Sequence, residues 1–291
     1  MTEARSAGEP QVSVVVPTRD RPGPLAACLA AVEAQTVESF EVVVVDDASS
    51  DPAAVAEVVA AAPHARLVRG AGRGPAAARN RGAAAARAPI LCFTDDDCRP
   101  TPTWAAALAR RLDAGADAAA GATHNARPDN PYAAASQAIT NHLTRSSLDP
   151  ATGAVAFAPT CNLACRADVH RALPFDETFP LAAGEDRDWC ARLADRGIAI
   201  AYEPEAVVAH HQDLSLRTFW RQQVRYGRGA HRWQRGRAPG ARLQPARFYV
   251  DLVRTGFSLG PAAGALVLLA QAATAVGFAQ EALAPARSRA R

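Results

Sequence analysis

The chain contains no lysine, because all 32 of its basic residues are arginine. This absence excludes the chemistries that need a lysine amine: the lysine-containing phosphate-binding loop, the Schiff-base enzymes and the kinase-type ATP site. With 291 residues and 49% hydrophobic content, the chain can still bury the core of one large or two small domains. Alanine is spread over the whole sequence and occurs 70 times, so residue patterns are more informative here than helix propensity.

Cysteine is scarce and scattered, with six residues in the chain. The one close pair, Cys161 and Cys165, has no second pair nearby to complete a zinc-binding sequence motif. Free thiols in a reducing compartment are therefore expected. Residues 1–10 contain no apolar run, which predicts a flexible N-terminus without a secretory signal and a cytoplasmic catalytic body.

Positive charge is concentrated near the C-terminus. Residues 217–254 contain ten arginines and one acid, and they lead into the uncharged segment 255–280. A basic segment beside an apolar one favours a membrane surface over nucleic acid, so no nucleic-acid partner is expected. We expect an arginine-rich interfacial helical segment over 214–254, a hydrophobic helix over 255–283 that is long enough to anchor the chain, and a basic tail over 284–291. Two alternatives remain: the arginines form salt bridges to the acidic body, or the apolar helix packs on that body.

Short β-branched runs alternate with helical segments over residues 11–100. Such alternation predicts right-handed βαβ units around a parallel sheet, whose ligand lies at the carboxyl ends of the strands. The predicted strands are Val12–Pro17, Glu41–Asp46, Ala65–Arg69 and Ile90–Thr94, and the predicted helices are 23–35, 52–62 and 75–86. The remainder, 101–213, is less regular and is expected to build the acceptor side, with strands at Phe157–Cys165 and Ile198–Tyr202 and a helix over Glu185–Arg196 closed by Gly197.

Polar residues follow three of the predicted strands. Each acid alone could cap a helix, but clusters at one sheet edge indicate a ligand site. The clusters are Thr18-Arg19-Asp20, Asp46-Asp47 and Asp95-Asp96-Asp97. Asp95 and Asp97 directly follow a buried strand, and the strand period of two predicts that they project to one side and suit Mg²⁺ or Mn²⁺. An exposed turn that relieves repulsion between the three acids is the alternative.

Three further groups are candidate site residues with ordinary structural alternatives. Gly70–Pro75 permits a close turn over a diphosphate, with Arg79 and Asn80 as donors on the next helix, although Arg79 could lie on a solvated face. Glu185 and Asp186 could cap a helix or supply a general base. His210 could be a third metal ligand or a structural histidine, and the adjacent His211 leaves the register open.

An acidic pair after a strand is also typical of phosphatases of the haloacid-dehalogenase type. Their motif requires threonine or valine where this chain has Arg99, and a later lysine that this chain lacks. That interpretation is therefore unlikely to account for the Asp95–Asp97 cluster, and a metal site is favoured.

The order of these motifs resembles family 2 glycosyltransferases of the GT-A fold from about Val12 to Gly229. The segments that carry the resemblance are PTRDRPGPLAACLAAVEAQT, VVVVDDASSD, GPAAARNRG, FTDDDC, CNLACR, PFDETFP, GEDRDW and VVAHH. The resemblance implies an α/β protein with a Rossmann-like mixed sheet flanked by helices and a C-terminal hydrophobic helix. It implies a catalytic domain over 11–213, with a nucleotide-sugar half over 11–100 and an acceptor half over 101–213.

The resemblance also implies inverting transfer of a sugar from a nucleoside diphosphate sugar to a hydroxyl acceptor, with a divalent cation, Mn²⁺ or Mg²⁺, as cofactor. Asp186 would be the general base and Glu185 would contact the donor sugar or the acceptor. The nucleotide-sugar-binding residues would be Pro17, Thr18, Arg19, Asp47, Arg79, Asn80, Asp95 and Asp96, with Asp47 at the base and Arg79 near the diphosphate. The metal ligands would be Asp97, Asp95 and His210.

One departure from the family concerns processive members, which carry Gln-x-x-Arg-Trp. Here Arg232-Trp233 is preceded by Gly229 where the glutamine would stand, which favours transfer of a single sugar to a lipid-linked, polysaccharide or small-metabolite acceptor. Two alternatives remain. The chain could be a non-catalytic nucleotide-sugar-binding module or inactive paralogue, or a nucleotidyltransferase, which the missing lysine disfavours.

Overall fold

The computed structural model describes residues 9–179, 181–236 and 244–284. The predicted flexible N-terminus, part of the predicted helical segment 214–254 and the basic tail therefore fall largely outside the described residues. The elements run in the order β1 (Val12–Thr18), α1 (Pro22–Glu33), β2 (Phe40–Asp46), α2 (Pro52–Ala60), β3 (Ala65–Arg69), α3 (Pro75–Ala85), β4 (Ile90–Phe93), β5 (Cys98–Pro100), α4 (Trp104–Asp113), β6 (Ala118–Asn125), α5 (Pro131–Ser146), β7 (Leu148–Asp149), β8 (Ala154–Val155), the short 3-10 helix η1 (Thr160–Asn162), β9 (Leu163–Arg166), α6 (Ala167–Ala172), α7 (Glu185–Ala194), β10 (Ile200–His210), α8 (Leu216–Arg235), α9 (Ala246–Ser258) and α10 (Pro261–Leu283).

The centre of the molecule is one mixed sheet of ten strands. Its order is β3-β2-β1-β4-β9-β6-β10-β8-β7, with β5 paired to β10. The strands β1 to β4 are parallel, whereas β9 lies antiparallel between β4 and β6. The sequence therefore predicted both the mixed sheet and its N-terminal strands, which end within one residue of the expected bounds.

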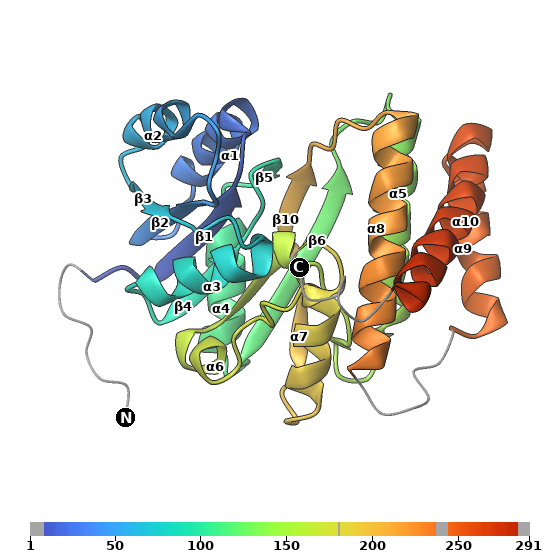
Figure 1. The fold of residues 1–291 in the computed structure, drawn as a ribbon. Coiled ribbons are helices and arrows are strands. Elements are labelled where there is room, and N and C mark those ends of the chain that lie inside the picture. The colour runs from blue at the N-terminus through green and yellow to red at the C-terminus, as the bar shows by residue number, and fades with distance from the viewer. Residues whose placement is uncertain (1–8, 180, 237–243, 285–291) are drawn as a thin grey trace.

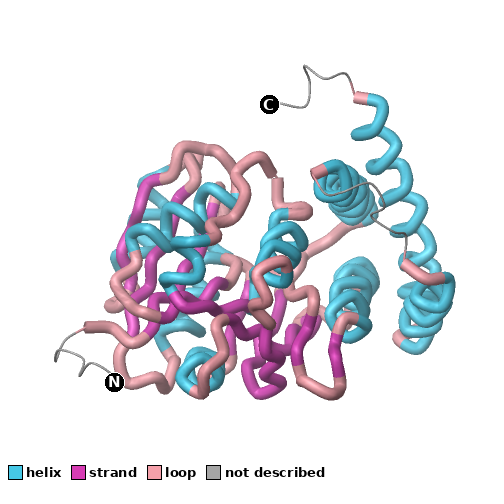
Figure 2. The backbone as a smooth tube through the Cα atoms, turned by 90° about the horizontal axis from the view of Figure 1, so that it is seen from below, coloured by secondary structure: helices cyan, strands magenta, loops and turns pink. Residues whose placement is uncertain are grey.

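Helices cover both faces of this sheet because its valine-rich strands are apolar on both sides. Val12, Val14 and Val16 contribute to the core under α1, α2 and α4. Val15 faces the other way, into a core shared with α3, α6 and α7. Figures 1 and 2 show the resulting layers and, beside them, a separate group of helices formed by α5, α8, α9 and α10. This arrangement leaves the carboxyl ends of β1, β2 and β4 open for a ligand site.

The second half differs from the expectation in several elements. β6 and α5 were not predicted, because alanine-rich segments give little periodic contrast. The expected strand Phe157–Cys165 is instead a loop, then η1, then β9. β10 continues to His210, beyond the predicted end at Tyr202, with a register shift between Glu203 and Val207. The longer strand carries His210 to the same edge as the acidic turn.

The hydrophobic segment 255–283 is not one helix, which corrects the prediction. α9 ends at Ser258 and α10 begins at Pro261, whose missing N–H and fixed φ suit the first turn of a helix but not its interior. Residues from Thr255 to Ser258 belong to α9, a short helix. The part long and apolar enough to cross a membrane, by length and composition only, is Pro261–Leu283.

The arginine-rich helix α8 packs against the apolar helix α10, and Arg228 and Arg232 pair there rather than with the acidic body. Its backbone crosses α10 so closely that a Cβ at Gly277 would lie 1.9 Å from the carbonyl oxygen of Val224. The guanidinium groups of Arg228 and Arg232 both bond the buried carboxylate of Glu281, each at 2.8 Å. These contacts join α8 firmly to α10.

Candidate functional site

The three consecutive aspartates lie in a turn rather than in a strand. β4 ends at Phe93, and the N–H of Cys98 bonds the carbonyl oxygen of Asp95 as the chain reverses. The period of two that would place Asp95 and Asp97 on one side therefore does not apply, and the expectation of a shared side was wrong. Asp95 faces α3, whereas Asp97 faces the end of β10.

Asp97 contacts two cationic groups. Its Oδ2 lies 2.9 Å from Nη2 of Arg21, and its Oδ1 lies 3.3 Å from Nε2 of His210. Burial disfavours the charged carboxylate, but the hydrogen bonds from His210 and Arg21 outweigh it and lower the pKa of Asp97. Burial alone would lower the pKa of His210, yet the bond to Asp97 raises it to about 9. His210, rather than His211, is thus the histidine whose side chain meets the acidic turn.

A chain of amides fixes the orientation of the His210 ring. Its Nδ1 lies 3.0 Å from Oε1 of the buried Gln137, whose own Nε2 donates to Asn141 at 2.8 Å. Asn141 in turn donates to the carbonyl oxygen of Thr123. A proton on Nδ1 leaves the lone pair of Nε2 free to bind a metal. The sequence did not indicate a role for Gln137, since it is one of several polar residues in a long helix.

The end of β1 supports the same turn. Thr18 donates to Oδ2 of Asp96 at 2.7 Å, and Arg21 contacts its Oδ1 at 3.0 Å. Burial raises the pKa of Asp96 to about 7, although Arg21 opposes the shift. Pro17 precedes Thr18 in β1, and Arg19 is exposed beside Asp20. The predicted Thr18 and Asp96 are therefore brought into direct contact, with Pro17 and Arg19 at the rim.

Asp47 organises the glycine-rich loop. Its Oδ1 accepts the N–H of Gly72 at 2.8 Å, and its Oδ2 accepts the N–H of Gly74 at 2.7 Å. The Asp47 carboxylate, expected to contact the nucleobase, is thus engaged by this loop. It shapes the chain that leads into α3.

Arg79 connects the acidic turn to the start of α7. Its Nη2 lies 2.7 Å from Oδ1 of Asp95, and its Nη1 lies 3.1 Å from Oε1 of Glu185. The Arg79 side chain is 3% exposed, and both its Nε and Oε2 of Glu185 are buried without a partner. Burial would lower the pKa of Arg79, but the two carboxylates raise it. A single charged guanidinium therefore holds the two acidic groups in one site.

The two acids that begin α7 both have raised pKa values. Burial and the neighbouring Asp186 raise the pKa of Glu185 to about 7, against the effect of Arg79. Burial also raises the pKa of Asp186, whose Oδ1 accepts the N–H of Arg187 at 2.7 Å. A carboxylate whose pKa is raised in this way is a better proton acceptor than an ordinary aspartate.

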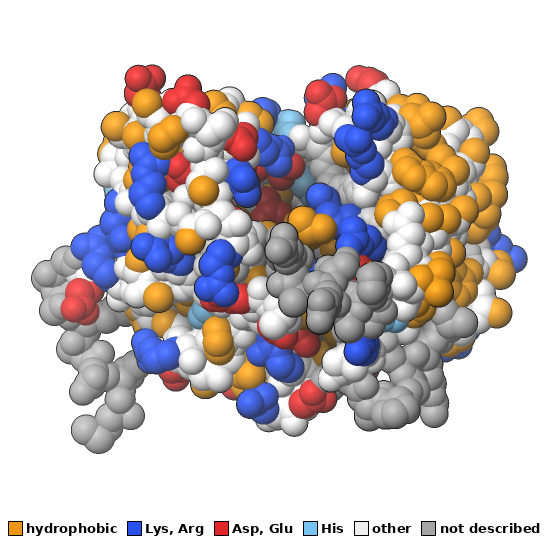
Figure 3. Space-filling model, in the orientation of Figure 1, with side chains coloured by type: hydrophobic (Ala, Val, Ile, Leu, Met, Phe, Trp, Pro, Cys, Tyr) orange, Lys and Arg blue, Asp and Glu red, His pale blue; other side chains and the backbone are white. Residues whose placement is uncertain are grey.

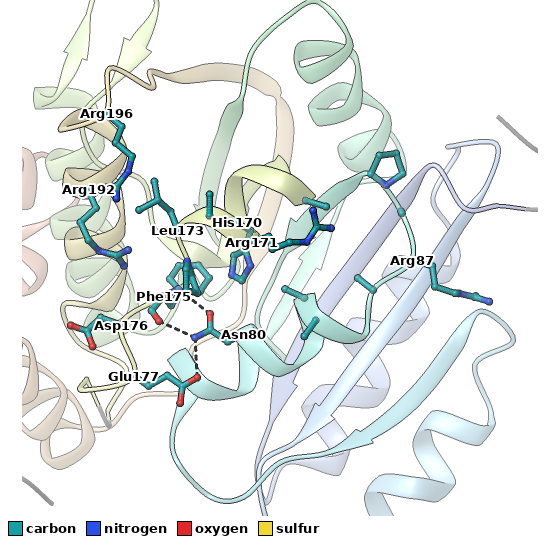
Figure 4. A pocket seen from close by; sticks show the side chains of 18 of the residues that line it. Asn80, Arg87, His170, Arg171, Leu173, Phe175, Asp176, Glu177, Arg192 and Arg196 are labelled. Atoms are coloured by element: carbon teal, nitrogen blue, oxygen red, sulfur yellow. Dashed lines mark hydrogen bonds between the residues drawn. The ribbon is translucent and has the colours of Figure 1, made fainter. Parts of the chain in front are cut away.

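Asn80 is directed away from this site, which corrects its expected place beside the diphosphate. Its Nδ2 donates to the carbonyl oxygen of Phe175 and to Glu177, and its Oδ1 accepts the N–H of Phe175. Residues 79 and 80 are adjacent on a helix and so point in different directions. Asn80 lines a separate pocket of about 1180 Å³ between α3, α6 and α7, which Figure 4 shows with His170 and Arg192.

α8 forms a wall beside the α7 acids. Burial raises the pKa of its Tyr226, and Asp186 adds to this shift although Arg225 opposes it. The Nε of Arg225 is buried without a partner. A Cβ at Gly229 would lie 2.3 Å from the carbonyl oxygen of Ala183, just before α7. Figure 3 shows a hollow between this wall and the α1–α3 side, in which acidic and basic side chains gather.

The donor set fits a hard divalent cation at Asp97 and His210. A carboxylate oxygen and an imidazole nitrogen 3.3 Å apart can both reach one Mn²⁺ or Mg²⁺ ion, and open positions suit water and phosphate oxygens. Asp95, the third predicted ligand, is paired with Arg79 instead. The structure thus brings together two of the three predicted metal ligands.

Solved structures resemble most of the chain in fold. The mannosyltransferase PcManGT from Pyrobaculum calidifontis, solved with GDP-Man and Mn²⁺, matches with a TM-score of 0.61 and 21% identity, over 97% of this chain and 78% of that one. Glucosyl-3-phosphoglycerate synthase from Mycobacterium tuberculosis, solved with Mn²⁺, UDP and glucosyl-3-phosphoglycerate, matches with a TM-score of 0.56 and 21% identity, over 79% and 80% of the two chains. At this identity the likeness shows a GT-A-like fold.

The relatives found by sequence comparison are glycosyltransferases too. The pre-mycofactocin glycosyltransferase of Mycobacterium tuberculosis is 30% identical over 75% of this chain, which spans 46% of that relative's length. Glycosyltransferase AglE of Haloferax volcanii is 29% identical over 76% of this chain and 73% of its own length. The model of the family described as glycosyl transferase family 2 matches residues 13–173, more than half of the chain. The resemblance of the motifs is therefore confirmed, and the chain belongs to glycosyl transferase family 2.

Proposed function

We propose that this chain is a metal-dependent, inverting glycosyltransferase that moves one sugar from a nucleoside diphosphate sugar to a hydroxyl acceptor. The observation that carries the proposal is the bridge made by Arg79 between Asp95 and Glu185. It joins the acidic turn, which suits a cation and phosphates, to the α7 acids, which suit proton transfer.

Each part of the site has a role in this proposal. Asp97 and His210 would hold the cation, which supplies positive charge where the departing diphosphate becomes more negative. Arg79, whose Nε has no partner, adds a second fixed positive charge beside Asp95. Thr18 and Arg21 keep the acidic turn in shape through their bonds to Asp96. Arg79 thus favours release of the nucleoside diphosphate, and a cation held by Asp97 and His210 would add to this effect.

Asp186 is the general base of the proposed reaction. Its carboxylate takes the proton of the acceptor hydroxyl as that oxygen bonds to the anomeric carbon, while the bond from this carbon to the diphosphate oxygen breaks. One displacement on the face opposite to the leaving group inverts the configuration, so no covalent enzyme intermediate forms. Glu185, fixed by Arg79, lies beside the base and is placed to contact the sugar or the acceptor.

Transfer of a single sugar is supported by the tight contact at Gly229. Because its Cβ would lie 2.3 Å from the carbonyl oxygen of Ala183, the glutamine of the processive pattern cannot stand there without displacing the start of α7. We expect one sugar per acceptor in a product analysis by mass spectrometry. A ladder of products from a defined acceptor would contradict this part of the proposal.

Calorimetric titration tests the donor half of the proposal. UDP, GDP and dTDP are titrated into the wild type and Asp97→Asn, each with and without Mn²⁺. We expect tight, Mn²⁺-dependent binding of one nucleotide that is lost in Asp97→Asn. Binding of none of the three would contradict the proposed function, and binding without any turnover of the matching nucleotide sugar would favour a non-catalytic nucleotide-sugar-binding module.

We also propose that the outer face of α9 and α10 lies on the cytosolic surface of a membrane. This face has unusually exposed apolar side chains, namely Val250, Phe257, Leu259, Leu268, Val276 and Leu283, and Figure 3 shows apolar side chains gathered on this side of the molecule. Arg247 and Arg254, which lie on α9 itself, complement anionic headgroups.

Co-sedimentation with vesicles tests the membrane proposal. The protein should pellet with vesicles that contain anionic lipid, and Leu268→Gln with Val276→Gln should reduce the bound fraction, since both side chains are at least 40% exposed. Leu148→Gln, at an exposed site 37% accessible on β7, is the matched control. Equal binding of all three proteins would contradict the role of this face.

A further inference from the structure

Two buried cysteines lie directly behind the Asp97 carboxylate. Cys98 begins β5, Cys161 lies in η1, and the antiparallel register of β5 and β10 places Cys98 opposite His210. The Sγ atoms of both cysteines and a ring nitrogen of His210 lie within 4.8 Å of one another. Sequence spacing gave no hint of this cluster, because its members come from three separate segments.

Asp97 borders this cluster on the side of the acidic turn. Its Oδ1 lies 3.3 Å from Nε2 of His210 and 3.9 Å from Sγ of Cys98. Around tetrahedral Zn²⁺, bonds of about 2.0 Å to nitrogen or oxygen and about 2.3 Å to sulfur separate neighbouring ligand atoms by roughly 3.3–3.8 Å. The two thiols and His210 can therefore surround one ion after small rotations, and Asp97 would complete the tetrahedron from the acidic turn.

The surroundings of the cluster support the same geometry. Gln137 bonds Nδ1 of His210, so that Nε2 can face the ion, and such a partner on the other ring nitrogen is typical of metal-binding histidines. The two thiols are buried, while Asp97 and His210 are 13% and 14% exposed and provide a path from the hollow. Arg21, bonded to the other oxygen of Asp97, offsets the negative charge of two thiolates and one carboxylate.

We propose that Asp97, Cys98, Cys161 and His210 form a tetrahedral site for a thiophilic divalent cation, Zn²⁺, and that its occupation excludes the hard cation used in sugar transfer. On binding, each thiol loses its proton to solvent and becomes a thiolate ligand. Mn²⁺ and Mg²⁺ prefer oxygen ligands and leave the thiols protonated, whereas Zn²⁺ prefers sulfur and nitrogen. Exclusion of the hard cation rests on the proposed function, but binding of Zn²⁺ does not.

Cobalt spectroscopy tests the site without any need for turnover. Co²⁺ is titrated, under a phosphine reductant that keeps the thiols reduced, into the full chain without nucleotide. We expect one Co²⁺ per chain, with sulfur-to-cobalt charge-transfer absorption and the intense visible bands of tetrahedral Co²⁺, and displacement of both signals by one equivalent of Zn²⁺. The charge-transfer signal should fall in Cys98→Ser and in Cys161→Ser, with Zn²⁺ affinity reduced about tenfold or more.

Cys165→Ser is the matched control, since Cys165 is equally buried but belongs to the core on the other face of the sheet. It should retain the full signal. Circular dichroism identifies any variant that does not fold, and Asp97→Asn then serves as a second test, because it should alter the visible bands while the sulfur signal remains. Octahedral Co²⁺ without sulfur absorption, or an unchanged spectrum in Cys98→Ser with Cys161→Ser, would overturn the proposed site.

The consequence for the proposed reaction is measured separately. In wild type, one equivalent of Zn²⁺ should abolish the Mn²⁺-dependent nucleotide binding, and in Cys161→Ser it should not. If wild type binds no nucleotide at all, the proposed function fails while the cobalt result stands. If Zn²⁺ binds with sulfur ligands and nucleotide binding is unaffected, the exclusion fails while the site stands.

Discussion

Arg79 links the acidic turn after β4 to the acids that begin α7, yet the pKa of a key carboxylate is lowered in the turn and raised in α7. In the turn after β4, Asp97 has both Arg21 and His210 as partners, and its pKa is lowered. At the start of α7, Asp186 accepts the backbone N–H of Arg187, but burial outweighs this bond and raises its pKa. The lowered pKa of Asp97 favours its charged form, whereas the raised pKa of Asp186 favours proton uptake. The difference separates a region suited to phosphates and metal from one suited to proton transfer.

The comparison predicts its largest effect for Asp186→Asn. An amide cannot accept the proton of the acceptor, so sugar transfer should fall by about 10²–10⁴-fold, while Mn²⁺-dependent nucleotide binding by calorimetry stays within a few-fold of wild type. Asp188→Asn, two residues along α7 and paired with Arg192, is the matched control and should retain transfer. Loss of nucleotide binding in Asp186→Asn would show that the two groups do not have separate roles.

Removal of the bridge should affect both groups at once. Arg79→Gln leaves Asp95 and Glu185 without their shared cation, and loss of one partner from a buried ion pair costs about 3–5 kcal/mol of unfolding free energy. Urea unfolding measures this loss. Arg110→Gln removes an exposed pair with Glu205, where both side chains are at least 60% exposed, and should cost no more than about 1 kcal/mol. Equal losses in the two variants would contradict the role of Arg79.

The pH dependence of the unfolding free energy should reveal the raised pKa of Glu185 in α7. Because burial raises the pKa of Glu185 to about 7 from 4.5, the folded state binds its proton more tightly than the unfolded state. Glu185 therefore makes unfolding free energy fall as pH rises from 4.5 towards 7. Relative to Glu185→Gln, wild type should lose on the order of 1–3 kcal/mol between about pH 5 and about pH 8. Urea unfolding at both pH values provides the test, and a pH-independent difference would contradict it.

The smallest effect is expected for Gln137→Leu, which changes the turn only through His210. Loss of the bond to Nδ1 frees the ring to rotate, and Mn²⁺ affinity should fall about 10–100-fold. Gln137→Glu keeps an acceptor for Nδ1 and should restore most of this affinity. Calorimetric Mn²⁺ titration in the presence of the bound nucleotide provides the measurement. An unchanged affinity in Gln137→Leu would mean that the amide chain does not position the histidine.

The sequence predicted the parts of this site that follow directly from strand ends. The strands β1, β2 and β4 are largely buried on both faces, and Thr18, Asp96 and Asp97 gather at the carboxyl ends of β1 and β4 as expected. Asp95 and Asn80 were misplaced, because the chain turns after Phe93 and adjacent helical residues point apart. Gln137 and the Cys98–Cys161 cluster could not be predicted, since contacts between distant segments depend on the packing of α5 and η1 rather than on local spacing.

The close crossing of α8 and α10 fixes how the catalytic cleft is oriented relative to the apolar face of α9 and α10. The backbone contact at Gly277 and the two salt bridges from Arg228 and Arg232 to Glu281 leave little room for the two helices to slide or rotate. A chain resting on a bilayer through α9 and α10 would therefore hold the opening at one height and one angle above the lipid. The distance from the headgroup plane to the hydroxyl of a lipid-linked acceptor would then determine whether that acceptor can enter the cleft. Acceptors that are too short or too long would be excluded.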